Sequence, residues 1–177
     1  ISVSGGQDSM SLLTLINDIK EVHQWKVYVW HGDHRWHNNS QYYAKSIKSF
    51  CKKQNITFYS DYVLKDEKIS TEETAREWRY RKLLNKAQEI KNQAKQQKDV
   101  YILTGHTSTD NAETFLINLA RGSNFTGLKG IPNKRLLDNE FYIVRPILNL
   151  SREDTSSICK LLNIPIWEDP TNKDLKL

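Results

Sequence analysis

The sequence lacks the features that mark metal-centred, disulfide-rich and membrane-spanning proteins. Its 177 residues include only two cysteines, Cys51 and Cys159, which lie far apart and form no Cys-x-x-Cys pair. That spacing disfavours a zinc site, an iron–sulfur site and a disulfide framework, and we expect each cysteine to be a small buried residue on a helix. No run approaches about 18 consecutive apolar residues, so no membrane-spanning helix and no membrane partner are predicted.

No targeting leader is visible in these residues. No basic and apolar segment precedes the first motif, which begins almost at Ile1. The strand that feeds such a motif usually has about four to six residues. We therefore expect the natural N-terminus, with any address that it carried, to be missing from this chain.

The composition that is present suits one soluble domain. An apolar content of 38% and an aromatic content of 10% predict a single globular domain over residues 1–177, because a chain of this length can bury one sizeable core. The net charge of +5 favours a polyanionic partner. Lysine-rich helices give the same charge balance in many other proteins, so charge alone does not identify the partner.

The most informative motif is Ser-Gly-Gly-Gln-Asp-Ser at residues 4–9. Apolar residues at helical spacing follow it, so the motif is expected to join a strand to a helix whose first-turn N–H groups point at the loop. Gly5 and Gly6 leave room for an anion to approach the backbone, and the hydroxyls of Ser4 and Ser9 can donate to phosphate oxygens. A tight turn is the structural alternative for a glycine pair. The string has neither the Gly-Lys-Ser/Thr end of a Walker loop nor the third glycine of a dinucleotide fingerprint, which argues against those two sites.

Strand and helix patterns alternate along the rest of the chain. After the strand that leads into the motif, strands are predicted at residues 26–30, 56–59, 100–104 and 142–144. Helices are predicted from a first turn that includes Asp8 and Ser9, and over residues 40–53, 71–95, 109–121 and 152–162. The predicted caps are Asn39, either Ser70 or Thr71, and Ser151. The alternation predicts an α/β, doubly wound parallel sheet, in which ligands sit beyond the carboxyl ends of the strands.

Two of these strand ends carry candidate carboxylates. Asp33 follows the second strand, between His31 and His34, and is expected to face the crevice of the nucleotide loop. The histidines could bind a metal or could be hydrogen-bonded residues of a polar loop, and both interpretations stay open. Asp110 and Glu113 are three residues apart, so on a helix they share a face in the first turn. They would either complement the helix dipole or face a triphosphate, where Asp110 could supply a carboxylate to Mg²⁺.

Two basic segments are candidates for substrate contact. Residues 119–132 join a cationic helix end, at Arg121, to a glycine-rich loop beside the same crevice. A helix stop followed by an irregular loop is the structural alternative. The predicted helix over residues 71–95 carries Arg76 and Arg79, which on their own would indicate a solvated basic face.

The loop at residues 4–9 resembles that of the PP-loop ATP pyrophosphatases, in which the same Ser-Gly-Gly-x-Asp-Ser string grips the pyrophosphate of ATP. Further segments, in order along nearly the whole chain, are similar to the tRNA(Ile)-lysidine synthases within that group. They are Glu-x-x-Ala-Arg-x-x-Arg-Tyr at residues 72–80, Gly-His-x-x-x-Asp-x-x-Glu-Thr at 105–114, Arg-Gly-Ser-x-x-x-Gly-Leu-x-Gly-Ile-Pro at 121–132, Arg-Pro-Ile-Leu at 145–148 and Glu-Asp-Pro-Thr-Asn-Lys-Asp at 168–174.

The resemblance implies a HUP-type sheet and a two-step reaction on the wobble cytidine of a tRNA(Ile) with a CAU anticodon. ATP, with Mg²⁺, adenylylates the C2 oxygen of the base and pyrophosphate leaves. The amine of free L-lysine then displaces AMP and forms lysidine. The implied partners are that tRNA and lysine, a homodimer stays open, and the implied location is the bacterial cytoplasm or the plastid stroma.

The resemblance also assigns roles to the matching positions, residue by residue. The ATP phosphates are expected at Ser4, Gly5, Gly6, Asp8 and Ser9, and Mg²⁺ at Asp110. The candidates for binding the lysine ammonium or taking its proton are Asp33 and Glu113. The candidates for RNA phosphates are Arg76, Arg79 and Arg121.

Departures from the family pattern narrow these expectations. The family usually has His-His and paired aspartates where this chain has His106-Thr107 and Thr109-Asp110, which weakens a two-carboxylate metal site. The family pattern also continues beyond Asp174 into tRNA-binding domains, which we expect to be absent from this chain. A tRNA 2-thiolase stays an alternative, disfavoured by the missing cysteine pairs, and so does a non-catalytic RNA-binding module, disfavoured by the intact nucleotide loop.

Overall fold

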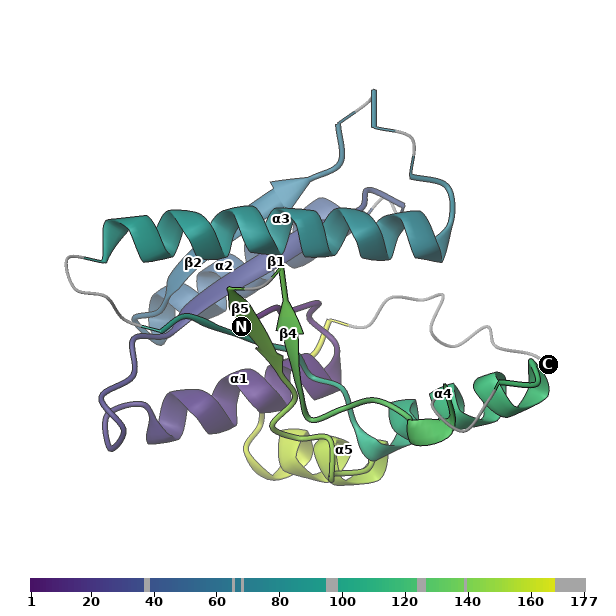
Figure 1. Ribbon diagram of the computed structural model, residues 1–177. Coiled ribbons are helices and arrows are strands. Elements are labelled where there is room, and N and C mark those ends of the chain that lie inside the picture. The colour runs from purple at the N-terminus through teal and green to yellow at the C-terminus, as the bar shows by residue number, and fades with distance from the viewer. Residues whose placement is uncertain are drawn as a thin grey trace.

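The computed structural model is an α/β fold in which helices cover both faces of a central sheet (Figure 1). It describes residues 1–36, 39–64, 66–67, 69–94, 99–123, 127–138 and 140–167. The strands are β1 (Tyr28–Asp33), β2 (Thr57–Tyr62), β3 (Tyr101–Leu103), β4 (Lys134–Leu137) and β5 (Phe141–Val144). The helices are α1 (Gln7–Ile19), α2 (Ser40–Lys53), α3 (Glu72–Gln93), α4 (Ser108–Ala120), α5 (Arg152–Leu161) and the 3₁₀ turn η1 (Gly127–Lys129).

The N-terminal residues join two groups of strands into one sheet. Ser2 forms parallel bridges with Trp30 of β1 and with Thr104, the residue after β3. β2 pairs in parallel with β1, and β5 pairs in parallel with β3. The order is therefore β2, β1, the Ser2 segment, β3, β5 and β4. This order confirms the predicted doubly wound sheet and puts the loop after Val3 where the strand order reverses, the usual ligand position in such a sheet.

The sequence analysis missed one strand. β4 pairs antiparallel with β5, with Lys134 opposite Val144 and Leu137 opposite Phe141, so the edge of the sheet is a hairpin and the sheet is not wholly parallel. Three of the four β4 residues are exposed, which leaves no apolar alternation to reveal the strand. Its turn includes Asp138 at a φ of +52°, and the hairpin depends on pairing with β5 rather than on the propensity of Lys-Arg-Leu-Leu.

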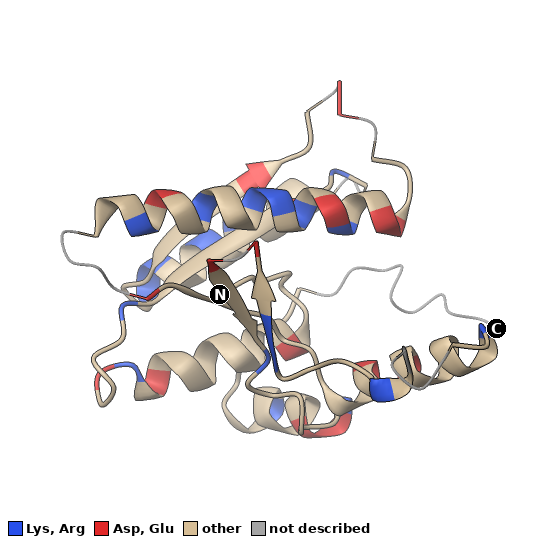
Figure 2. Ribbon diagram, in the orientation of Figure 1, with Lys and Arg blue, Asp and Glu red and all other residues tan. Residues whose placement is uncertain are grey.

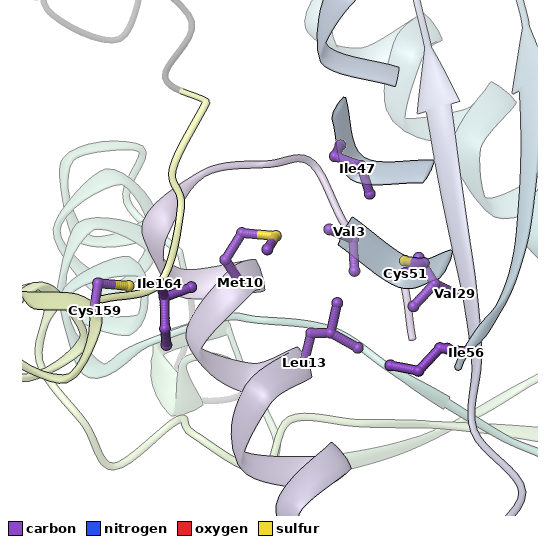
Figure 3. Close-up of a cluster of buried hydrophobic side chains, with 9 residues drawn as sticks. All are labelled: Val3, Met10, Leu13, Val29, Ile47, Cys51, Ile56, Cys159 and Ile164. Atoms are coloured by element: carbon purple, nitrogen blue, oxygen red, sulfur yellow. The ribbon is translucent and has the colours of Figure 1, made fainter. Parts of the chain in front are cut away.

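Buried side chains pack on both faces of the sheet. On one face, Met10 and Leu13 of α1 meet Ile47 of α2, together with Val3, Val29, Cys51, Ile56, Cys159 and Ile164 (Figure 3). On the other face, Trp78, Leu83 and Ala87 of α3 pack on Trp30, Ile102 and Ile143. Both cysteines are buried on helices, as expected.

Local sequence signals set most helix starts. Capping boxes begin α3 at Thr71, α4 at Thr107 and α5 at Ser151, in each case with the residue three positions on. The predicted caps at Thr71 and Ser151 are confirmed. Asn39 precedes α2 but its side chain makes no capping hydrogen bond. β1 also runs further than predicted, so His31 and Asp33 lie within the strand rather than after it.

α4 stands apart from the packed layers. It extends away from the sheet and the other helices (Figure 1), and none of its residues is buried. Within the described parts of the chain, no helix is long and apolar enough to cross a membrane.

Candidate functional site

The Ser9 hydroxyl organises the loop between the Ser2–Val3 segment and α1. It accepts the backbone N–H groups of Ser4 and Gly5, each at 3.2 Å, and donates to the Gly6 carbonyl at 3.0 Å. The Ser4 hydroxyl lies 3.1 Å from it and accepts the Gly6 N–H at 3.3 Å. Ser9 is only 7% exposed, so in this structure its hydroxyl holds the loop, and its role as a phosphate donor stays a prediction.

The first turn of α1 presents backbone donors beside this loop. Gly6 is the N-cap and provides no capping side chain. The N–H groups of Gln7, Asp8 and Ser9 have no acceptor among the described residues, whereas the N–H of Met10 already bonds to the Gly6 carbonyl at 3.0 Å. Three free donors at a helix N-terminus form an anion-binding position.

Glycines allow the backbone to approach closely at this position. Gly5 has a φ of +101°, a conformation that other residues rarely adopt. Gly105, which follows β3, lies against the loop so closely that an added Cβ would be 3.0 Å from the backbone of Asp8 and of Ser9. Gly105 was not a predicted site residue, although it begins a motif that the sequence analysis quoted. The loops after Val3 and after β3 are therefore in close contact.

Three of the predicted carboxylates meet at an unpredicted arginine. Arg152, the first residue of α5, lies 3.0 Å from Asp110, 3.6 Å from Glu113 and 3.8 Å from Asp8. Asp8 also accepts the hydroxyl of Thr155. Burial raises the pKa of Asp8, the Thr155 hydrogen bond opposes that shift, and the nearby Asp110 raises the pKa further. The Arg152 cation therefore helps to keep these like charges together.

The carboxylate of Asp110 both caps α4 and forms an ion pair with Arg152. One oxygen accepts the Thr107 backbone N–H at 2.7 Å and completes the α4 capping box, while the other meets Arg152. Among the described residues no group of three or more His, Cys, Asp or Glu side chains is arranged to hold a metal by itself. Carboxylate oxygens are nevertheless the donors that Mg²⁺ prefers, and Mg²⁺ is commonly held by one or two of them plus substrate phosphates. Asp110, with Asp8 beside it, fits that requirement.

Asp33 and its neighbouring histidines form a separate group at the end of β1. Asp33 is 7% exposed and accepts the Arg35 N–H at 2.8 Å. His31 is buried, its Nδ1 lies 2.8 Å from the Val3 carbonyl, and burial lowers its pKa. Burial also lowers the pKa of His34 to about 4, helped by the nearby Arg79. The geometry of His31 suits a hydrogen-bonded structural histidine, the second of the two interpretations left open. The buried Nδ1 of His34 has no hydrogen-bond partner among the described residues.

The three arginines predicted to contact RNA lie in two separate parts of the structure. Arg76 and Arg79 lie on α3, and both contribute, after burial and Arg145, to lowering the pKa of His106 to about 4, so they lie near the crevice. Arg79 pairs with Glu72 at 3.1 Å. Arg121 instead ends α4, where its N–H bonds to the Ile117 carbonyl, at the end that extends away from the sheet (Figure 1).

The glycine-rich loop is held to α4 by a residue that the sequence analysis did not select. Asn111 accepts the Ile131 N–H at 2.6 Å. Gly130 has a φ of +68°, and a Cβ there would lie 2.3 Å from the Asn111 side-chain oxygen. Residues 124–126 of this loop and the motif at 168–174 lie outside the described residues.

Comparison with known proteins adds family evidence. The model of the PP-loop domain family matches residues 1–177. A tRNA(Ile)-lysidine synthase from Prochlorococcus marinus subsp. pastoris is 58% identical over 177 residues, which are 100% of this chain and 52% of that protein. A chloroplastic tRNA(Ile)-lysidine synthase from Pyropia yezoensis is 38% identical over 172 residues, 97% of this chain and 50% of that protein. The chain thus spans about half the length of the curated relatives it matches.

Solved structures share the fold at low identity. A U34-tRNA thiolase from Methanococcus maripaludis, which has a [4Fe-4S] cluster, superposes with a TM-score of 0.75 at 15% identity, covering 96% of this chain and 57% of that one. An NH3-dependent NAD synthetase from Campylobacter jejuni gives a TM-score of 0.52 at 15% identity, covering 92% of this chain and 62% of that one. At these identities the likeness shows the fold alone.

Proposed function

The chain belongs to the PP-loop domain family, and from that premise we propose that it is the ATP-using domain of an enzyme that converts the wobble cytidine of a tRNA(Ile) with a CAU anticodon to lysidine. The observation that carries the proposal is the anion position at the start of α1. There, three N–H groups without an acceptor in the described part of the chain, together with a glycine loop, lie beside the Asp8, Asp110 and Glu113 cluster. The names of relatives that match nearly all of this chain support the choice of tRNA and amine.

The proposed chemistry uses the loop to make a good leaving group. The C2 oxygen of cytidine attacks the α-phosphorus of ATP and pyrophosphate leaves. The backbone donors of the first turn of α1 would hold the phosphates and stabilise charge that develops on their oxygens. Ser4, Gly5 and Gly6, whose N–H groups bond to the Ser9 and Ser4 hydroxyls, would shape the loop around the phosphates. Mg²⁺ bound at Asp110 would neutralise phosphate charge.

The second step needs a carboxylate near the amine. The nitrogen of lysine attacks C2, AMP leaves with the former C2 oxygen, and the nitrogen loses its proton to a base. Glu113 is the better placed of the two candidates because its side chain is 56% exposed at the edge of the cluster. Asp33 is buried and already accepts an N–H, so we propose that it has a structural role at the end of β1. Its binding of the lysine ammonium, or its action as the base, stays a prediction.

The thiolase alternative meets a chemical obstacle in this chain. The two cysteines of this chain are both buried. Burial raises the pKa of Cys51 to about 11 and also raises the pKa of Cys159. Neither is an accessible thiolate, the form that sulfur transfer and cluster binding require. The relatives include bacterial and chloroplastic proteins, so we keep both the bacterial cytoplasm and the plastid stroma as proposed locations.

Mass spectrometry of tRNA(Ile) incubated with the chain, ATP, Mg²⁺ and lysine tests the proposal. We expect a lysine-dependent mass gain confined to the CAU anticodon and one pyrophosphate released per modified tRNA. A mass gain that does not depend on lysine, or sulfur incorporated in place of lysine, would favour another PP-loop reaction. RNA binding without ATP turnover would favour the non-catalytic module.

Replacing Asp110 with asparagine tests the metal assignment. The neutral amide is a poorer ligand for a hard cation, so we expect the Mg²⁺ concentration for half-maximal turnover to rise about tenfold. Asp154→Asn is the matched control, because Asp154 fills the same capping-box position on α5 but is exposed. Equal Mg²⁺ dependence in the two variants would reduce Asp110 to a helix-capping residue.

We also propose that the chain forms a homodimer through α4. Residues 114–120 carry no charge, and Phe115, Leu116, Ile117 and Leu119 are between 40% and 60% exposed. Figure 2 draws this stretch without acidic or basic residues. An uncharged helix surface can pack against its own copy without leaving buried charges unpaired.

Light scattering of the chain and of Leu116→Glu checks this surface. We expect the variant to dimerise about tenfold more weakly, because a buried carboxylate would replace an apolar contact. Leu161→Glu is the control, since Leu161 is 80% exposed on α5. A monomeric parent chain would refute the homodimer. The apolar surface of α4 would then be expected to pack against the half of the protein that the relatives have and this chain does not span.

A further inference from the structure

Two aromatic side chains are exposed at the carboxyl edge of the sheet, outside the nucleotide loop. Trp36 is 43% exposed and Tyr62 is 50% exposed. Tyr62 ends β2 and pairs in register with Asp33, the last residue of β1, so it lies at the carboxyl end of these two strands. Trp36 follows β1 by three residues. We call Arg35, Trp36 and Tyr62 the edge platform.

The edge platform is held in place from beneath. The indole N–H of Trp36 donates to the Ile69 carbonyl at 3.3 Å. Its ring lies 5.4 Å from that of His34, which in turn meets the buried Trp78 edge-on at 5.0 Å. The platform is therefore a preorganised surface and not a loose side chain, which lowers the cost of ordering it when a ligand binds.

Arg35 adds a flat cation to the same surface. Its guanidinium lies 4.1 Å from the centre of the Tyr62 ring. Its backbone has a φ of +57°, a conformation unfavourable for a residue with a Cβ, and the Asp33 carboxylate fixes it by accepting the Arg35 N–H. A costly backbone conformation that is held by a specific hydrogen bond is typical of functional positions.

The charges around the edge platform favour a polyanion with flat groups. Arg35 and Arg79 are the nearby cations, while His34 is neutral at physiological pH. The acidic groups of this region are engaged: Asp33 accepts the Arg35 N–H, and Glu72 pairs with Arg79. Asp61 accepts the Trp30 indole N–H, and Glu67 accepts that of Trp78. Exposed aromatic rings beside guanidinium groups bind unpaired nucleobases by stacking, with the phosphates bound by the cations.

We propose that the edge platform stacks an unpaired base of the RNA substrate next to the base that enters the crevice. This inference rests on the proposed function, because a wobble base can reach a crevice only if the anticodon loop is opened. The flanking base then loses its own stacking partner in the loop, and Trp36 or the Arg35–Tyr62 pair replaces that partner. Nothing in the nucleotide loop requires these three residues, so the platform is a separate site.

Trp36→Ala tests the platform, with fluorescence anisotropy of a labelled anticodon stem-loop RNA as the measurement. We expect about tenfold weaker binding, a typical effect of losing one base–aromatic stack, and partial recovery in Trp36→Phe. Trp25→Ala is the matched control, because Trp25 is 48% exposed and also stacks on a histidine, at 4.4 Å, but lies in the connection before β1 at the opposite edge of the sheet. A blunt-ended RNA duplex of two strands, which has no unpaired base, should bind Trp36→Ala and the parent chain equally.

The outcomes separate this inference from the proposed function. If no lysidine forms but Trp36→Ala still weakens stem-loop binding, the platform stands and the proposed reaction fails. If lysidine forms and Trp36→Ala binds the stem-loop like Trp25→Ala, the platform is wrong. Equal loss for paired and unpaired RNA would also overturn it, since that result would mean a general structural effect or a protein-facing surface.

Discussion

Replacing Gly6 with valine is expected to lower tRNA-dependent pyrophosphate release by about 100-fold or more, because the branched side chain would fill the space through which a phosphate reaches the backbone donors of α1. Gly6 has ordinary extended torsions, with φ at −71° and ψ at 162°. An added Cβ would meet only the Ser4 hydroxyl, at 3.5 Å, which is a normal contact. The substitution should therefore block the anion and spare the fold.

Two measurements make this test specific. Thermal unfolding of Gly6→Val should match that of Ser49→Val, which adds the same side chain at an exposed position of α2. An ATP titration of the folded variant should show lost affinity. Normal ATP binding in a folded Gly6→Val protein would remove the loop from the nucleotide site. Asp8→Ala should also stop turnover, but it is a less selective test because Asp8 also bonds to Thr155 and Arg152.

Sequence reasoning succeeded where the signal is local. The glycine pair followed by helical apolar spacing located the turn into α1, and Ser151 with Asp154 located the start of α5. Alternating strand and helix patterns predicted the sheet, and with it the edge at which Asp33 and the nucleotide loop lie. Each of these inferences needs only neighbours within a few residues or the general behaviour of βαβ units.

The site contacts that could not be predicted join segments that are distant along the chain. Arg152 reaches Asp8 because α5 packs against α1, and it reaches Asp110 and Glu113 because the starts of α4 and α5 are hydrogen-bonded to each other. No pattern around residue 152 indicates either contact. The hydrogen bonds from Thr155 to Asp8 and from the Ile131 N–H to Asn111 also join distant residues, and no local pattern indicates them. Gly105 could have been found, since a glycine directly after a buried strand suggests close backbone approach.

The chain alone is expected to bind tRNA with strong salt dependence. If Arg76, Arg79 and Arg121 each neutralise one phosphate, affinity should fall about 20- to 40-fold between about 50 and about 200 mM salt. Replacing one of them with alanine should reduce the slope of log affinity against log salt by about 0.7 to 0.9. Arg81→Ala is the matched control on α3, because Arg81 is exposed but pairs with Glu67 at 2.9 Å. An unchanged slope in Arg76→Ala, equal to that of Arg81→Ala, would remove Arg76 from the RNA interface.

The same binding should discriminate little between tRNA(Ile) and tRNA(Met) that carry the same CAU anticodon. Phosphate contacts report charge and not sequence, and stacking on Trp36 would accept any base because every base has a flat face. Choosing one tRNA requires contacts to its distinct bases and shape over a wider surface. The curated relatives are about twice as long as this chain, and we expect such a surface in the half that this chain does not span. Competition binding at near-physiological salt decides the point, since a large preference for tRNA(Ile) would mean that these 177 residues read its identity themselves.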